Sequence, residues 1–313
     1  MILISLVRST GRRREELMTK ILVPPIKCQG IKTKLVSLIL SCAANIKSER
    51  WIEPFMGSGV VGLNARRPVA VFADLNPHLI NFYSAIKAGT ITPEIAREFL
   101  EKEGNRLETL GEKHYYEVRD RFNEYASPLD FLFLSRACFN GMIRFNGKGK
   151  FNVPFCRKPE RFARAYITKI VNQISQFQEA IRYYRWNFIC QEFEKTILQA
   201  SADDLIYCDP PYLGRHVDYF DSWTESDEQK LFDALSATKA RFILSTWHSN
   251  QYRMNETLRT LWKRFHLVTQ EHFYHVGAKE SNRNPMLEAL IMNFVPLKRK
   301  TEKKRILQPV LFK

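Results

Sequence analysis

The consecutive residues Asp209, Pro210, Pro211 and Tyr212 combine a carboxylate, a rigid backbone and an aromatic ring directly after an apolar segment. The preceding residues 205–208 (Leu-Ile-Tyr-Cys) are typical of a short buried strand. Two consecutive prolines prevent a helix and favour an extended turn. In such a turn the Asp209 carboxylate and the Pro210 carbonyl can accept hydrogen bonds beside the Tyr212 ring. These groups suit an exocyclic amino group on a planar base, which needs two acceptors and one stacking face.

A second candidate site is the segment 53–59, Glu-Pro-Phe-Met-Gly-Ser-Gly, which follows another expected strand. Gly57 and Gly59 allow the backbone to approach a ligand where a Cβ atom would collide. Asp74 comes 15 residues after Gly59, at the end of a further apolar segment, where a carboxylate commonly accepts ribose hydroxyls. With Gly62 the spacing also fits a dinucleotide site, but the Pro-Pro-Tyr turn favours S-adenosylmethionine over NAD.

These segments require a scaffold in which strands and helices alternate. Expected strands cover residues 50–54, 69–73, 187–190, 205–208, 241–246, 266–275 and 288–294. The order of strand, glycine loop, helix and strand predicts an α/β fold with a doubly wound, mostly parallel, seven-stranded Rossmann-like sheet. The last two strands have hairpin character.

Residues 91–186 separate two parts of this sheet and differ from it in composition. Helical patterns at 93–103 and 115–125 are followed by a Gly- and Asn-rich stretch, which predicts an inserted subdomain of helices and a β-hairpin. The expected domains are an N-terminal extension (1–21), a catalytic domain (22–90 and 187–297), the insert (91–186) and a basic tail (298–313).

The charge of the chain points to a polyanionic partner. The net charge is +15 over 313 residues, and an excess of this size is typical of nucleic-acid binding. Between residues 136 and 169 there are nine Lys or Arg residues and one acid, interleaved with phenylalanines. This mixture suits phosphate anchoring with base contacts, although a solvated basic face over a small core has the same composition.

Other site classes find little support. The six cysteines form no CxxC pair, so we expect reduced thiols, a cytoplasmic protein and no metal site. No Pro precedes Cys28 or Cys190, so neither resembles the nucleophile of cytosine-C5 methylases. The spacing of His272 and His275 would place them on opposite faces of a strand. No apolar run approaches the ~20 residues of a membrane span.

The first residues have an unusual composition. Residues 11–17 read Gly-Arg-Arg-Arg-Glu-Glu-Leu directly before Met18, and Arg and Glu codons are purine-rich. We therefore expect that this stretch is a translated ribosome-binding sequence and that Met18 is the native start.

The two motifs together, with the glycine loop first and Asp-Pro-Pro-Tyr last, resemble the Dam-type DNA adenine-N6 methyltransferases. The resemblance covers roughly residues 22–295. It implies transfer of a methyl group from S-adenosylmethionine to N6 of an adenine flipped out of double-stranded DNA, without a metal, by a target-recognition insert and a catalytic domain. Restriction–modification is the commonest setting of this family, which implies a partner endonuclease.

The resemblance also implies cofactor-binding residues. Lys27 and Lys32 match the two lysines of the family's Lys-Trp-Ala-Gly-Gly-Lys element, from which Cys28 and Ile31 depart. Glu192, in Cys-Gln-Glu-Phe, takes the place of the acid in the family's Gly-Asp-Phe, which accepts from the cofactor adenine. The expected cofactor-binding residues are Lys32, Glu53, Phe55, Gly57, Gly59, Asp74, Glu192 and Asp209.

The segments 140–146 and 151–154 (Phe-Asn-Val-Pro) match the family's DNA-reading hairpin. Arg144 is the candidate for a bidentate guanine contact, and Arg161 is a further candidate for phosphate binding. The expected DNA-binding residues are Lys27, Asn140, Arg144, Asn146, Lys148, Lys150, Asn152, Arg157 and Lys158.

Several alternatives stay open. The same chemistry fits an rRNA adenine methyltransferase, and N4 of cytosine resembles N6 of adenine, although such enzymes usually carry Ser in place of Asp209. The departures at Cys28 and Ile31 leave a catalytically decayed DNA-binding scaffold as a third reading. Tyr219, Phe220 and Trp223 either close over the base or pack in the core. No heptad pattern is legible, so we expect a monomer.

Overall fold

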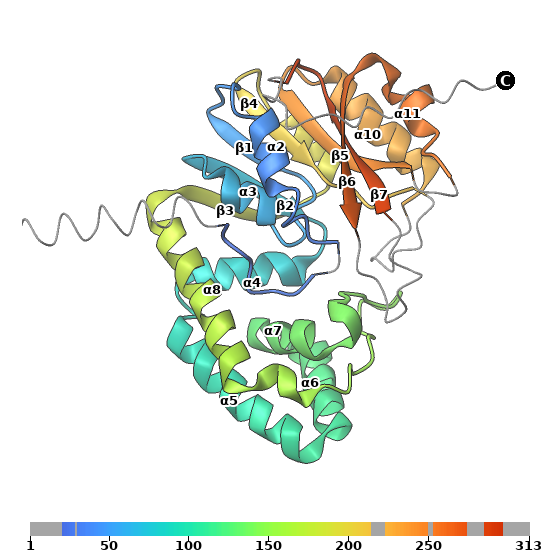
Figure 1. The fold of residues 1–313 in the computed structure, drawn as a ribbon. Helices are drawn as coiled ribbons and strands as arrows, with labels where there is room; N and C mark the ends of the chain where they lie inside the picture. The colour runs from blue at the N-terminus through green and yellow to red at the C-terminus, as the bar shows by residue number, and fades with distance from the viewer. Residues whose placement is uncertain (1–20, 29, 214–222, 250–252, 274–284, 297–313) are drawn as a thin grey trace, which may run out of the picture.

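The computed structural model describes residues 21–28, 30–213, 223–249, 253–273 and 285–296, with one seven-stranded sheet and flanking helices (Figure 1). The strands are β1 (Arg50–Glu53), β2 (Val69–Asp74), β3 (Arg185–Cys190), β4 (Asp204–Cys208), β5 (Arg241–Ser249), β6 (His266–Phe273) and β7 (Pro285–Met292). The α-helices are α2 (Val36–Cys42), α3 (Val60–Ala65), α4 (Pro77–Ala88), α5 (Pro93–Leu110), α6 (Glu112–Tyr125), α7 (Pro128–Ala137), α8 (Arg164–Tyr183), α9 (Phe193–Leu198), α10 (Glu225–Ala237) and α11 (Thr257–Thr260). Among the described residues no helix is both long and apolar enough to cross a bilayer. The expectations for residues 1–17, Met18, Tyr219, Phe220, His275 and the tail 298–313 concern segments outside the described residues.

The strands lie in the order β3-β2-β1-β4-β5-β7-β6. The first five are parallel, whereas β7 runs antiparallel to both β5 and β6. The predicted doubly wound, mostly parallel sheet is therefore confirmed. The direction in which successive strands are added reverses between β1 and β4, and ligands of open α/β sheets bind at such switch points.

The central strands β1 and β4 are held in register by burial and by one ion pair. All five residues of β4 are buried, as are Trp51 and Ile52 of β1. Arg50 lies opposite Asp204 in the ladder, and its guanidinium donates to that carboxylate at 2.6 and 2.9 Å. The pair closes the amino end of both strands, so that their carboxyl ends are left for the glycine loop and for Asp209.

The helices α5 to α8 gather at one side of the molecule, beyond α4 (Figure 1). The hydrophobic core continues into them from the sheet, for example where Tyr83 of α4 packs between Phe177 of α8 and Phe188 of β3, with ring centroids 5.1 and 5.5 Å away. The helical layer therefore shares one core with the sheet.

The expected β-hairpin of the insert takes a looser form. Residues 138–155 pair only at two isolated bridges, Cys138 with Phe155 and Phe145 with Phe151. The side chain of Asn123 on α6 bonds both the amide (2.7 Å) and the carbonyl (3.1 Å) of Phe151, which satisfies backbone groups that a regular ladder would pair. The hairpin is thus fastened to a helix rather than to a strand.

Candidate active site

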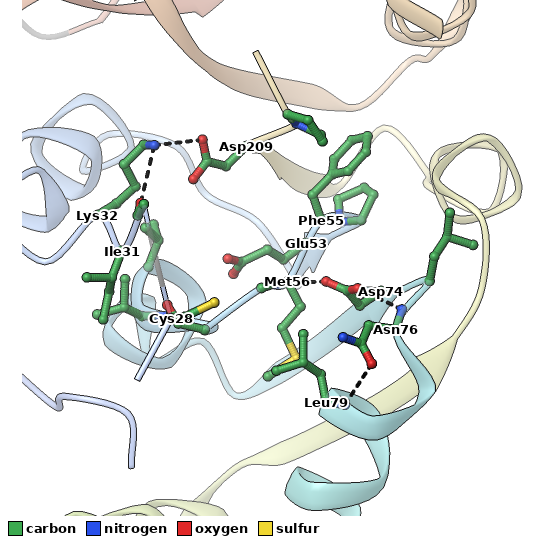
Figure 2. A pocket seen from close by; sticks show the side chains of 18 of the residues that line it. Cys28, Ile31, Lys32, Glu53, Phe55, Met56, Asp74, Asn76, Leu79 and Asp209 are labelled. Carbon is green, nitrogen blue, oxygen red and sulfur yellow. Dashed lines mark hydrogen bonds and ion pairs between the residues drawn. The ribbon is translucent and has the colours of Figure 1, made fainter. Parts of the chain in front are cut away.

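The switch point of the sheet brings the two predicted motifs together. Because β1 and β4 are parallel neighbours, the glycine loop after Glu53 and the turn at Asp209 emerge at the same edge. Between them lies a cavity of about 250 Å³, whose walls include Glu53, Phe55, Asp74 and Asp209 (Figure 2). Residues 30–32, which precede β1 in the sequence, form a further wall of the cavity.

Asp74 holds the glycine loop in place. Its carboxylate accepts from the backbone amides of Gly57 (2.8 Å) and Asn76 (2.9 Å). Gly57 and Gly59 have φ angles of 48° and 70°, a left-handed conformation that favours glycine. Burial raises the pKa of Asp74, although these hydrogen bonds oppose the shift. The predicted contact of Asp74 with a ribose stays a prediction, and in it one carboxylate would both shape the loop and bind the ligand.

Glu53 is a buried acid at the floor of the cavity. Its Oε2 accepts from Trp51 Nε1 (3.1 Å) and from the amide of Gly62 (2.9 Å). Burial raises the pKa of Glu53 to about 8, although the two hydrogen bonds act in the opposite direction. Without a cationic ligand, the Glu53 carboxyl therefore carries a proton at neutral pH.

This proton makes the stability of the unliganded protein depend on pH. The pKa of Glu53 is near 4.5 when exposed and about 8 when folded, so its stabilising contribution is complete below pH 4.5 and is lost as the pH rises through 8. Glu53→Gln keeps an acceptor for both donors without the charge, so its free energy of unfolding should exceed that of the wild type progressively more between pH 5 and pH 9. Urea unfolding without cofactor measures this. Glu49→Gln, an exposed acid next to β1, is the matched control, and a Glu53→Gln difference that does not change with pH would contradict the assignment.

Lys32 pairs with the catalytic candidate. Its Nζ lies 3.1 Å from Asp209 Oδ1 and 3.5 Å from the carbonyl of Gly30 (Figure 2). Burial raises the pKa of Asp209, and the nearby ammonium group of Lys32 opposes this shift. Lys32 thus favours the ionised form of Asp209, the form that accepts hydrogen bonds at both oxygens.

Tyr212 lies beside the pair of Lys32 and Asp209. Its ring packs against Trp247 of β5, and Lys32 Nζ lies 4.8 Å from its centroid. Its hydroxyl donates to Glu288 Oε2 on β7 at 2.7 Å. Reasoning from the sequence missed Glu288, although an acid in the apolar segment Met-Leu-Glu-Ala-Leu was a visible signal.

An aromatic cluster forms another wall. The ring of Phe55 stacks on Phe193 at 5.1 Å and meets Trp223 edge-on at 5.6 Å. Trp223 Nε1 donates to Glu228 at 2.8 Å, which fixes the indole beside the cavity. Of the two readings for Trp223, the structure therefore shows packing against the cofactor-side aromatics. Glu192 is exposed and is not among the lining residues, unlike its neighbour Phe193, and its contact with the cofactor adenine stays a prediction.

Neither Cys28 nor Cys190 has the character of a nucleophile. Burial raises the pKa of the Cys28 thiol to about 12, and the carboxyl groups of Asp74 and Asp209 act in the same direction. The pKa of Cys190 is also raised, chiefly by burial. Both thiols are therefore protonated at neutral pH, in agreement with the sequence-based expectation.

Comparison with known proteins identifies the family. The model of the D12 class N6 adenine-specific DNA methyltransferases matches residues 29–276. The chain belongs to this family.

Three relatives show how far the similarity extends. The retron Ec67 DNA adenine methylase of Escherichia coli is 30% identical over 82% of this chain and 87% of its own length. The Type II methyltransferase M.FokI of Planomicrobium okeanokoites is 29% identical over 86% of this chain and 42% of its own length. The DNA adenine methylase of Serratia marcescens is 36% identical over 51% of this chain and 57% of its own length. The chain thus spans about half the length of the last two relatives.

The hairpin residues that are expected to contact DNA have different surroundings in the structure of this D12 class chain. Arg144 Nε donates to Asn152 Oδ1 at 2.9 Å, which joins two of them. Asn146 has a structural task, because its Oδ1 accepts from the amides of Lys148 and Lys150 at 3.0 Å each and so holds the turn. The exposed members are Asn140, Asn146, Lys148, Lys150, Arg157 and Lys158.

Two basic residues at the hairpin base are tied to the protein itself. Arg161 donates to the carbonyls of Arg136 (3.0 Å) and Cys138 (3.1 Å), and its contact with a phosphate stays a prediction. Lys27 packs on Gly141, where an added Cβ would lie 2.7 Å from its side chain. The pKa of Lys27 is lowered by burial and by the nearby cations Arg161 and Arg136. Contact of Lys27 with DNA stays a prediction.

Proposed function

We propose that this chain transfers a methyl group from S-adenosylmethionine to N6 of an adenine flipped out of double-stranded DNA. The observation that carries the proposal is the group Lys32, Asp209 and Tyr212, assembled at the edge of a glycine-loop cavity in a member of the D12 class. This arrangement offers a carboxyl acceptor paired with an ammonium group, and an aromatic ring, next to the cavity.

The groups that line the cavity match the chemistry of the proposed cofactor. Asp74 and Glu53 supply carboxyl groups, Gly57 supplies accessible backbone, and Phe55 supplies an apolar wall; Gly59 is buried and does not line the cavity, so its predicted contact with the cofactor stays a prediction. When bound, S-adenosylmethionine supplies an electrophilic methyl group on a sulfonium. The cationic sulfonium and amino groups suit a cavity with three buried or half-buried acids, and binding them would favour the ionised form of Glu53.

The residues of the chain would then act on the target base. Extruding an adenine from the duplex costs about a few kcal/mol, which stacking on Tyr212 would offset. The Asp209 carboxylate and the Pro210 carbonyl would accept hydrogen bonds from the two hydrogens on N6. These bonds would direct the nitrogen lone pair out of the ring plane. As N6 gains positive charge, the Asp209 carboxylate would stabilise that charge. Lys32 already positions this carboxylate.

Arg144 is the proposed base-reading residue of the insert, because a hydrogen bond to Asn152 restrains its side chain. Arg144→Ala should relax sequence preference at one base pair and weaken specific binding by about 1–3 kcal/mol. Binding titrations on cognate and single-mismatch duplexes measure this. The matched control is Lys148→Ala at the exposed turn, which should weaken binding to all duplexes alike and reduce its salt dependence. A uniform loss for Arg144→Ala would make it a phosphate contact.

We propose that the protein acts on DNA in the cytoplasm as a monomer. We also propose that it belongs to a restriction–modification system with a cognate endonuclease, and the similarity to M.FokI, a Type II methyltransferase, supports this setting. Ribosomal RNA is the competing substrate, and the family to which the chain belongs favours DNA.

Transfer of tritiated methyl groups from S-adenosylmethionine tests the proposal, with unmethylated plasmid DNA and ribosomal RNA offered in parallel. Label in DNA is the expected result. Label in RNA alone would select the competing substrate, and tight DNA binding without label in either polymer would indicate a decayed scaffold.

A further inference from the structure

Glu288 is a buried acid in the middle of an apolar strand. It lies on β7 opposite Trp247 of β5 and Gln270 of β6, and its residue exposure is 1%. A carboxyl group at such a position is costly unless a partner satisfies it, so its presence in the strand calls for a specific partner.

That partner is the tyrosine of the Asp-Pro-Pro-Tyr turn. Tyr212 Oη donates to Glu288 Oε2 at 2.7 Å, and both groups are buried. The bond connects the turn after β4 to β7, a strand that comes 76 residues later in the chain. Neither element is sequentially near the other, so the bond is a tertiary restraint on the turn.

The restraint acts on a part of the turn that the backbone leaves free. Strand β4 and the two prolines fix the backbone from Cys208 to Pro211, but the tyrosine ring still has two rotatable bonds. Packing against Trp247 limits the ring on one side, and Lys32 Nζ lies 4.8 Å from its centroid. The hydrogen bond to Glu288 restrains rotation about χ1, which would move the hydroxyl end of the ring most. Rotation about χ2 turns the ring about the axis through its hydroxyl and is limited by the packing against Trp247.

We propose that Glu288 is a positioning residue, which holds the Tyr212 ring in the orientation that stacks on the flipped base. This inference rests on the proposed function. Glu288 would touch neither base nor cofactor and would act through the tyrosine hydroxyl. Its loss should therefore lower kcat and leave the KM for S-adenosylmethionine unchanged.

Substitutions on both sides of the bond test this role. Glu288→Leu and Tyr212→Phe should each lower kcat about tenfold, the size of effect that one buried hydrogen bond supports. The double variant should be no slower than Tyr212→Phe alone, because Tyr212→Phe already removes the bond that Glu288→Leu removes, together with the hydrogen bond of the hydroxyl to Asp209. Glu288→Gln retains an acceptor and should keep kcat within about threefold of the wild type. Glu271→Gln, an exposed acid on the neighbouring β6, is the matched control and should change nothing.

A fluorescence measurement separates positioning from simple loss of stability. With 2-aminopurine at the methylated position, stacking on Tyr212 quenches emission, so Glu288→Leu should increase the emission of the flipped base and Glu288→Gln should not. If Glu288→Leu fails to fold, Tyr212→Phe still reports on the bond, because it leaves β7 intact.

Three results would overturn the inference: an unchanged kcat in Glu288→Leu or Tyr212→Phe, additive losses in the double variant, or a Glu288→Gln loss as large as that of Glu288→Leu. The wild type is assayed first. If it transfers no methyl group to DNA, the proposed function fails and the positioning role with it, whereas an active wild type with insensitive variants refutes the positioning role alone.

Discussion

Asp209→Ala is expected to reduce methyl transfer by about 10²–10³-fold or more, because it removes the acceptor on which the developing charge at N6 depends. DNA binding should stay close to that of the wild type, since Asp209 follows the carboxyl end of β4, whereas all the predicted DNA-binding residues except Lys27 lie in the insert. The measurement is the single-turnover rate of methyl transfer together with the affinity for DNA.

The control for this variant is Asp203→Ala, an exposed acid directly before the opposite end of the same strand, which should keep wild-type activity. Asp209→Ala also leaves Lys32 without its carboxylate partner, so thermal melting accompanies the rates. Activity of Asp209→Ala within tenfold of the wild type would refute the catalytic assignment.

Gly62→Ala should disrupt the cofactor side of the site. A Cβ atom at Gly62 would lie 2.2 Å from Glu53 Oε2, 2.4 Å from Phe72 Cε1 and 2.6 Å from Trp51 Nε1. None of these buried groups can move far, so we expect a loss of about 1–3 kcal/mol in the free energy of unfolding. Displacement of Glu53 should also weaken binding of S-adenosylmethionine.

Gly147→Ala is the matched control, because nothing lies within 4 Å of a Cβ atom at that position. Its free energy of unfolding should remain within about 0.5 kcal/mol of the wild type. Urea unfolding and calorimetric titration with cofactor give both quantities. A Gly62→Ala variant with wild-type stability and cofactor affinity would show that the packing around Glu53 is more adaptable than these distances imply.

The sheet could be predicted from the sequence because each strand is a short apolar run that ends at a polar or turn residue. Residues 204–208, all buried in β4, are followed by Asp209, and residues 69–74 end at Asp74. Parallel strands place their carboxyl ends on the same side of the sheet. Local patterns were therefore enough to predict that the glycine loop and the Asp209 turn lie close together.

Helix lengths were less predictable. The expected helix at 93–103 continues to Leu110, across a glycine that disfavours helix on propensity alone. Gly104 lies against Phe162, where a Cβ atom would come within 2.7 Å of Phe162 Cβ. Close packing between the helix and residues 159–162 therefore explains the glycine, and no local signal reveals that contact.

The pairings within the site were the least predictable part. The sequence indicated Lys32 and Asp209 separately, but their ion pair joins distant segments through the fold. The same holds for Tyr212 and Glu288 and for Asn123, which fastens the hairpin. Such contacts depend on the tertiary arrangement, which strand and helix periodicity leaves undetermined.

The identity of the methylated base is the most direct test of the central claim. DNA labelled by the wild-type protein is digested to nucleosides, and the methylated product is separated and identified by mass spectrometry. The account predicts N6-methyladenine at one recurring sequence. N4-methylcytosine as the product, or no methylated nucleoside in DNA at all, would contradict it.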